Sequence, residues 1–106
     1  MRLSELQEHL KSANKVGVIT LSNGVELSVQ ASENHYCTPR DNDGPWISVE
    51  VGISHKDFYE LRFILRDLDI LQKFEMSGLD FWIASWLPIG NVIDITEHSY
   101  LTEDED

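Results

Sequence analysis

The sequence predicts an α+β domain, in which an antiparallel sheet of three or four strands is packed by one main helix and a short N-terminal helix. Three observations predict this class. Alternating apolar and polar residues flank an Asn23-Gly24 turn, a helical stripe of apolar residues follows Ser54, and an aromatic run ends at Pro88. We expect a single domain over residues 1–101 and a disordered acidic tail over residues 102–106.

The first elements are a helix and a hairpin. Residues 3–13 place leucines at helical spacing, and Ser4 followed by Gln7 resembles a capping box. Asn23-Gly24 favours a two-residue type I′ turn, because both positions need positive φ. The strand before the turn, residues 16–21, is apolar on both faces. The strand after it alternates, with its apolar face made by Val25, Leu27 and Val29.

The remaining elements follow a long loop. Residues 46–51 predict a third strand, with Ile47, Val49 and Val51 on one face and Trp46, Ser48 and Glu50 on the other. Ser54 and Asp57 form a second capping-box signature before the main helix, residues 55–69, whose stripe is Phe58, Leu61, Ile64, Leu65 and Leu68. Residues 71–76 either extend that helix or form a separate turn.

The aromatic run over residues 79–87 predicts a fourth strand. Strict alternation places Phe81, Ile83 and Ser85 on one face and Trp82, Ala84 and Trp86 on the other. Pro88 ends the strand. Residues 91–95 suit either a short helix or a fifth strand, and we favour the helix.

The densest group of reactive side chains lies in the loop at residues 31–45. Its Asp, Asn, Gly and Pro content predicts a loop, and its Tyr and Cys predict that it is ordered and folded back on the sheet. The candidate ligand-binding residues are His35, Tyr36, Cys37 and Arg40.

Three kinds of chemistry involve residue types found in this loop. His35 and Cys37 supply too few ligands for zinc, so a surface histidine and a buried cysteine are favoured. Cys37 as a nucleophile with His35 as its base lacks a marked orienting group. Residues 41–44 resemble a fragment of a calcium loop, but an Asx turn is favoured. The sequence identifies no catalytic residue, no metal ligands and no cofactor.

Arg40 has two interpretations. It could clamp an anionic ligand, such as a phosphate or a carboxylate, through its planar guanidinium. We favour a structural salt bridge to a neighbouring Asp, because an acidic chain offers many partners.

A family resemblance is carried by the same region. Gln30-Ala31-Ser32, His35-Tyr36-Cys37, Pro39-Arg40 and Val49-Glu50-Val51-Gly52 resemble a pattern in small bacteriophage-encoded proteins of unknown function. The resemblance covers about the middle third of the chain. It implies a phage origin and an ordered loop, and it assigns no activity.

Charge narrows the classes of partner. The chain has 8 basic and 19 acidic residues, a formal net charge of -11, and no basic residue follows Lys73. Such a charge disfavours direct contact with nucleic acid or with anionic membranes. The single Cys fits a reducing compartment, and residues 1–15 lack the apolar stretch of a signal peptide. We expect a cytoplasmic protein, in the host cell if phage-encoded.

These features favour a non-enzymatic interaction protein that binds and inhibits a host protein, one that handles nucleic acid or serves in defence. Trp82 and Trp86 share a strand face, and with Asp94 and Glu97 they make an aromatic and acidic candidate surface for a partner. The partner would present a basic nucleic-acid-binding groove. The alternatives are a small-ligand binder or small enzyme built on the His35–Arg40 loop, and an assembly partner that forms a homo-oligomer.

Overall fold

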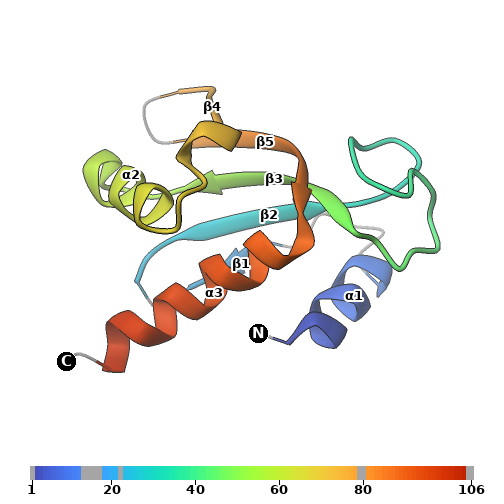
Figure 1. Ribbon diagram of the computed structural model, residues 1–106, viewed down its shortest axis with the longest axis horizontal. Coiled ribbons are helices and arrows are strands. Elements are labelled where there is room, and N and C mark those ends of the chain that lie inside the picture. The colour runs from blue at the N-terminus through green and yellow to red at the C-terminus, as the bar shows by residue number, and fades with distance from the viewer. Residues whose placement is uncertain (1, 13–17, 22, 79–80, 105–106) are drawn as a thin grey trace.

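A five-stranded antiparallel sheet organises the computed structural model, with strand order β1-β2-β3-β5-β4 (Figure 1). The structure describes residues 2–12, 18–21, 23–78 and 81–104. The predicted α+β class is confirmed, with five strands in place of three or four. The elements are α1 (Leu3–Ser12), β1 (Val18–Thr20), β2 (Glu26–Gln30), β3 (Ser48–Ser54), α2 (Phe58–Asp67), the 3₁₀ helix η1 (Leu71–Lys73), β4 (Glu75–Met76), β5 (Phe81–Pro88) and α3 (Ile89–Asp104).

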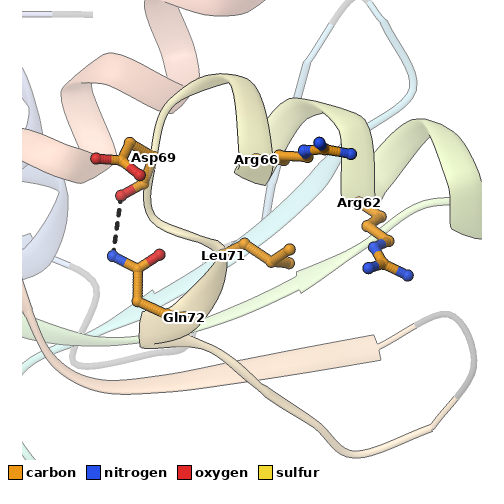
Figure 2. Close-up of a pocket in the computed structure, with 5 residues that line it drawn as sticks. All are labelled: Arg62, Arg66, Asp69, Leu71 and Gln72. Atoms are coloured by element: carbon orange, nitrogen blue, oxygen red, sulfur yellow. Dashed lines mark hydrogen bonds between the residues drawn. The ribbon is translucent and has the colours of Figure 1, made fainter.

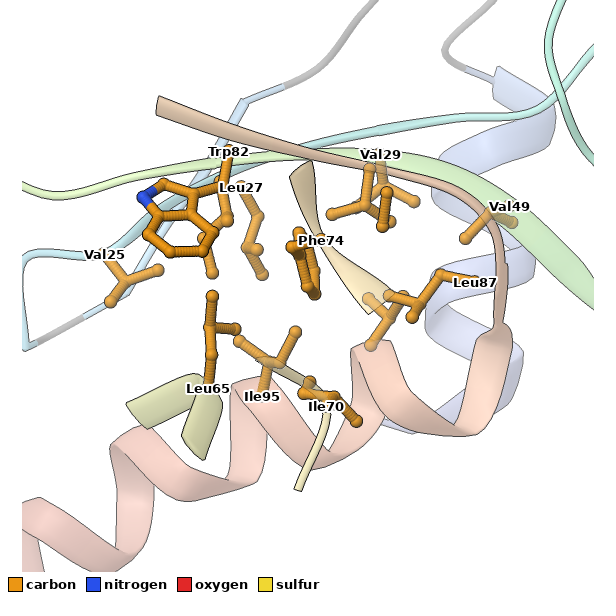
Figure 3. Close-up of a cluster of buried hydrophobic side chains, with 14 of the residues drawn as sticks. Val25, Leu27, Val29, Val49, Leu65, Ile70, Phe74, Trp82, Leu87 and Ile95 are labelled. Carbon is orange, nitrogen blue, oxygen red and sulfur yellow. The ribbon is translucent and has the colours of Figure 1, made fainter. Parts of the chain in front are cut away.

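One face of the sheet carries the core. Alternate residues of β2 and β3 are buried, as the period of a strand requires. Figure 3 shows these side chains meeting Leu65 of α2, Phe74 after η1 and Ile95 of α3. The buried positions predicted for the central strands and the main helix include Val25, Leu27, Val29, Val49, Val51, Leu61, Ile64 and Leu65, and all are confirmed.

The pairing of β3 with β5 contains a register shift. Val51 pairs with Ala84, whereas Val49 pairs with Leu87, so one residue of β3 faces two residues of β5. Those two residues are Ser85 and Trp86, and Trp86 has φ +52°. This is a β-bulge, which inserts a residue and re-aims the side chains after it.

The bulge overturns the prediction that Trp82 and Trp86 share a face. Trp82 is buried in the core, whereas Trp86 is 52% exposed. Strict alternation fails because Ser85 and Trp86 are both exposed before Leu87 returns to the core.

The start of β3 also differs from the prediction. The strand begins at Ser48, so Trp46 and Ile47 lie before it and do not follow its alternation. Trp46 is buried and Ile47 is exposed, the reverse of the expected faces. Gln7 helps to hold Trp46 out of the strand alternation. Its side chain accepts a hydrogen bond from the Trp46 N–H (3.0 Å) and donates one to the Trp46 carbonyl (2.7 Å). The predicted capping role of Gln7 with Ser4 is therefore wrong, and α1 begins at Leu3.

The hairpin between β1 and β2 has a longer loop than predicted. Thr20 pairs with Glu26, and the Leu21 N–H donates to the Val25 carbonyl at 2.8 Å, so the expected two-residue type I′ turn is wrong. Gly24 has φ +92°, and a Cβ there would lie 3.2 Å from His55 Nε2. The backbone conformation thus favours glycine, and a Cβ would also require His55 to shift by a few tenths of an ångström.

The main helix begins later than predicted. Asp57 is its N-cap and accepts hydrogen bonds from the N–H groups of Tyr59 (2.9 Å) and Glu60 (3.3 Å). Ser54 instead ends β3, so its predicted capping role is wrong. His55 joins the two regions, because its Nδ1 accepts from the Asp57 N–H and its Nε2 contacts the Asn23 carbonyl at 2.9 Å.

The C-terminal part is more regular than predicted. Residues 71–76 form η1 and β4 and do not extend α2. The helix favoured for residues 91–95 is confirmed as part of α3. That helix includes residues 102–104, which were expected to belong to a disordered tail, while residues 105–106 lie outside the described part of the chain.

Across the ranges that the structure describes, no helix has the length and apolar character needed to cross a bilayer.

The clamp between Gln7 and Trp46 gives a stability prediction. Gln7→Ala leaves the Trp46 backbone N–H and carbonyl without these partners, so the free energy of unfolding should fall by about 1–3 kcal/mol. Denaturant unfolding measures the change. Lys11→Ala, an exposed change on the same helix, should shift it by about 0.5 kcal/mol or less. Equal stability of Gln7→Ala and wild type would show that the clamp contributes nothing.

Candidate functional site

The loop between β2 and β3 is held by its own polar groups. Asp41 Oδ1 accepts hydrogen bonds from the N–H groups of Asp43 (3.1 Å) and Gly44 (2.9 Å), which is the Asx turn favoured by the sequence. The Trp46 indole donates to the Asp41 carbonyl at 3.2 Å. The Thr38–Pro39 and Gly44–Pro45 peptide bonds are cis. The prediction that the loop folds back on the sheet is confirmed by the bridge from Thr38 to Ser48.

This loop reaches the bulge in β5. The Trp86 N–H donates to the Tyr36 carbonyl at 3.1 Å. The two aromatic rings lie 4.8 Å apart between centroids, tilted by 39°. The Arg40 guanidinium carbon lies 5.4 Å from the centre of the Tyr36 ring, within the range of a cation–π interaction. We call Arg40, Tyr36 and Trp86 the aromatic stack.

The aromatic stack is open to solvent. Tyr36 is 46% exposed and Trp86 is 52% exposed, and Arg40 is exposed beside them. In the part of the chain that the structure describes, no Asp or Glu forms the salt bridge favoured for Arg40. The Arg40 guanidinium therefore presents its donors to solvent or to a partner.

Cys37 faces the opposite way from its neighbour Tyr36. It is 2% exposed, and its Sγ lies 3.2 Å and 3.3 Å from the carbonyl oxygens of Ser32 and Pro39, which accept the S–H. Burial raises the pKa of the Cys37 thiol, against the opposing effects of its hydrogen bond to Ser32 and of Arg40. A nucleophilic cysteine needs a lowered pKa, so Cys37 is built as a structural thiol.

His35 is hydrogen-bonded to Ser32. Its Nδ1 lies 2.6 Å from Ser32 Oγ, so this ring nitrogen serves to hold the loop. The four residues predicted to bind a ligand are thus divided. Tyr36 and Arg40 join the aromatic stack, whereas His35 and Cys37 stabilise the loop from within.

The four residues predicted to bind a partner are also divided. Trp82 belongs to the core and is removed from the surface set. Trp86 joins the aromatic stack. Asp94 and Glu97 are exposed on α3, which follows β5 directly, and no hydrogen bond or ring contact in the described residues joins them to the stack.

A hollow lies beside the loop in the described part of the chain. A small hollow between α1 and the end of the loop is lined by Gln7, Glu8, Lys11, Asp43, Pro45 and Trp46, and by none of the predicted ligand-binding residues. In the described part of the chain, no three His, Cys, Asp or Glu side chains converge as a metal site would require.

Comparison with protein-family models, with curated proteins and with solved structures finds no match for this chain. The bacteriophage resemblance therefore stays a prediction, and function rests on the geometry above.

The environment of Cys37 predicts low reactivity. Iodoacetamide should alkylate the native thiol at least about tenfold more slowly than the thiol of the chain unfolded in denaturant, because the buried group resists ionisation. The chain has one Cys, so the mass of the alkylated protein reports on this residue alone. Equal alkylation rates for the native and the unfolded chain would contradict the structural role of Cys37.

The same pKa shift has a consequence for stability. The folded state favours the protonated thiol. The contribution of Cys37 to the free energy of unfolding is therefore complete below the pKa of the unfolded thiol, and it is lost as the pH rises through the pKa of the folded thiol.

Proposed function

We propose that this chain is a non-enzymatic, phage-type interaction protein that binds and inhibits a host protein. The observation that carries the proposal is the exposed aromatic stack of Arg40, Tyr36 and Trp86. Tyr, Trp and Arg are the residues most enriched at energetic hot spots of protein interfaces. Here they are held by a backbone hydrogen bond and by ring contacts, so little conformational entropy is lost on binding.

The charge of the chain supports a basic partner. The net charge is -11, and the exposed Asp94 and Glu97 lie on a helix with no basic residue but His98. Such a surface is complementary to a groove that binds nucleic acid, and charge complementarity speeds association. We place the complex in the host cytoplasm, where the protein would compete with nucleic acid for a host nuclease or another nucleic-acid-handling protein.

A second candidate function is the binding of a small anionic ligand at the loop. One observation favours it: no carboxylate in the described part of the chain forms a salt bridge with Arg40, so a phosphate or carboxylate could occupy its donors. The two candidates differ in what the chain binds. A ligand site at Arg40 should bind inorganic phosphate and lose it in Arg40→Ala, whereas a partner surface built on the aromatic stack requires no small anion.

The proposal is tested by capture from bacterial lysate on immobilised protein. Trp86→Ala should weaken binding of the captured protein by about 2 kcal/mol, because it removes the larger ring of the aromatic stack. Met76→Ala, an exposed apolar change on β4, should leave binding close to that of wild type. A loss with Met76→Ala as large as that with Trp86→Ala would contradict the aromatic stack as the interface.

The electrostatic part of the proposal needs its own measurement. The affinity of the captured protein should fall as salt is raised, and duplex DNA should compete for it. Affinity that is unchanged by salt and by DNA would remove the basic groove from the proposal while leaving the aromatic stack as an interface.

A further inference from the structure

The outer face of α2 is a second surface of different chemistry. Tyr59, Arg62, Phe63 and Arg66 occur at i, i+3, i+4 and i+7, so they lie on one side of the helix. This side is opposite the buried stripe of Leu61, Ile64 and Leu65. Tyr59 is 79% exposed and Phe63 is 59% exposed, and both arginines are exposed. We call these four residues the α2 outer face.

The surface around Arg66 is hollowed on two sides. One hollow of about 290 Å³ is lined by Phe63, Arg66 and Asp67. The other, of about 270 Å³, is lined by Arg62, Arg66, Asp69, Leu71 and Gln72. Figure 2 shows Arg62, Arg66 and Leu71 at this second hollow, with Gln72 turned back to donate to the Asp69 carbonyl at 3.1 Å. Arg66 thus stands between two concave sites.

The arginines of this face are not engaged by the acidic residue that follows Arg66. That residue, Asp67, contacts His98 Nε2 at 3.0 Å. In the part of the chain that the structure describes, neither Arg62 nor Arg66 forms a salt bridge with a carboxylate. The chain has a net charge of -11, yet these two positive side chains lie one helical turn apart on the same face.

We propose that the α2 outer face binds an acidic segment of a partner protein. A carboxylate of that segment would accept hydrogen bonds from Arg62 and Arg66, since guanidinium groups match carboxylates in geometry. Apolar residues of the segment would pack on Phe63 and Tyr59. The overall charge of the chain disfavours a nucleic acid more than an acidic segment, because every nucleotide carries a phosphate whereas a short segment can carry one or two carboxylates.

This surface is distinct from the one proposed above. Figure 1 shows α2 at one end of the sheet and the loop between β2 and β3 at the other. The aromatic stack lies at the loop end, and the net charge of the chain favours a basic partner there. The two arginines of the α2 outer face favour an acidic partner. The protein would therefore be able to join two partners at once.

The test is selection of a random peptide library on the immobilised full chain. Enriched peptides should be rich in Asp and Glu and contain apolar residues. They should bind the Arg62→Ala/Arg66→Ala double variant about tenfold more weakly than wild type. The matched control is Arg2→Ala/Lys11→Ala, which removes the same charge from exposed positions on and before α1, and it should bind the peptides as wild type does.

Four results would overturn the proposal. Enriched peptides without an excess of Asp and Glu would contradict the acidic character proposed for the partner segment. Equal loss in both double variants would show a general charge effect and no site on α2. Preferential binding of an oligonucleotide to the α2 outer face would assign it to nucleic acid. A native mass of a dimer that becomes a monomer in the Arg62→Ala/Arg66→Ala variant would show that a second copy of the chain covers this face.

Discussion

The bulge in β5 is the constraint on which the surface of this protein depends. A non-glycine residue in the left-handed region costs about 1–3 kcal/mol, and Trp86 is held there at φ +52°. Two interactions that require this conformation offset the cost. The ring contact with Tyr36 contributes about 0.5–1.5 kcal/mol, and the hydrogen bond to the Tyr36 carbonyl contributes a similar amount. The bulge and the loop therefore stabilise one another. Because the bulge adds one residue to β5, it leaves Trp82 in the core while turning Trp86 to the surface.

The loop is fixed from its other side by Trp46. Its indole ring is buried, its N–H reaches Asp41, and its backbone is clamped by Gln7 of α1. The short N-terminal helix thus supports the loop that carries Tyr36 and Arg40. All three α-helices contribute side chains to the core, which lies on one face of the sheet (Figure 3). This one-sided packing leaves the two ends of the sheet to carry separate surfaces. One is the aromatic stack at the loop end, and the other is the α2 outer face with Arg62 and Arg66.

Much of the fold follows from local patterns in the sequence. The alternation through Val25, Leu27 and Val29 and the stripe through Leu61, Ile64 and Leu65 predict the buried faces correctly, because burial of one face imposes those periods. The division of the candidate site could not be predicted. It depends on a register shift and on contacts between residues about fifty positions apart, such as Tyr36 with Trp86. Local alternation carries no signal for either. The α2 outer face, by contrast, is visible in the sequence, since Tyr59, Arg62, Phe63 and Arg66 fall opposite the buried stripe.

The conformation of Trp86 is tested most directly by comparing the unfolding free energies of Trp86→Gly and Trp86→Ala. Both variants remove the ring contact with Tyr36, so their difference reports on the backbone alone. At an ordinary strand position, Gly is less stable than Ala by about 0.5–1 kcal/mol. At φ +52° the Cβ of Ala is strained, so the account predicts that Trp86→Gly is at least as stable as Trp86→Ala. A Trp86→Gly variant less stable than Trp86→Ala by about 1 kcal/mol would contradict the bulge and the surface built on it.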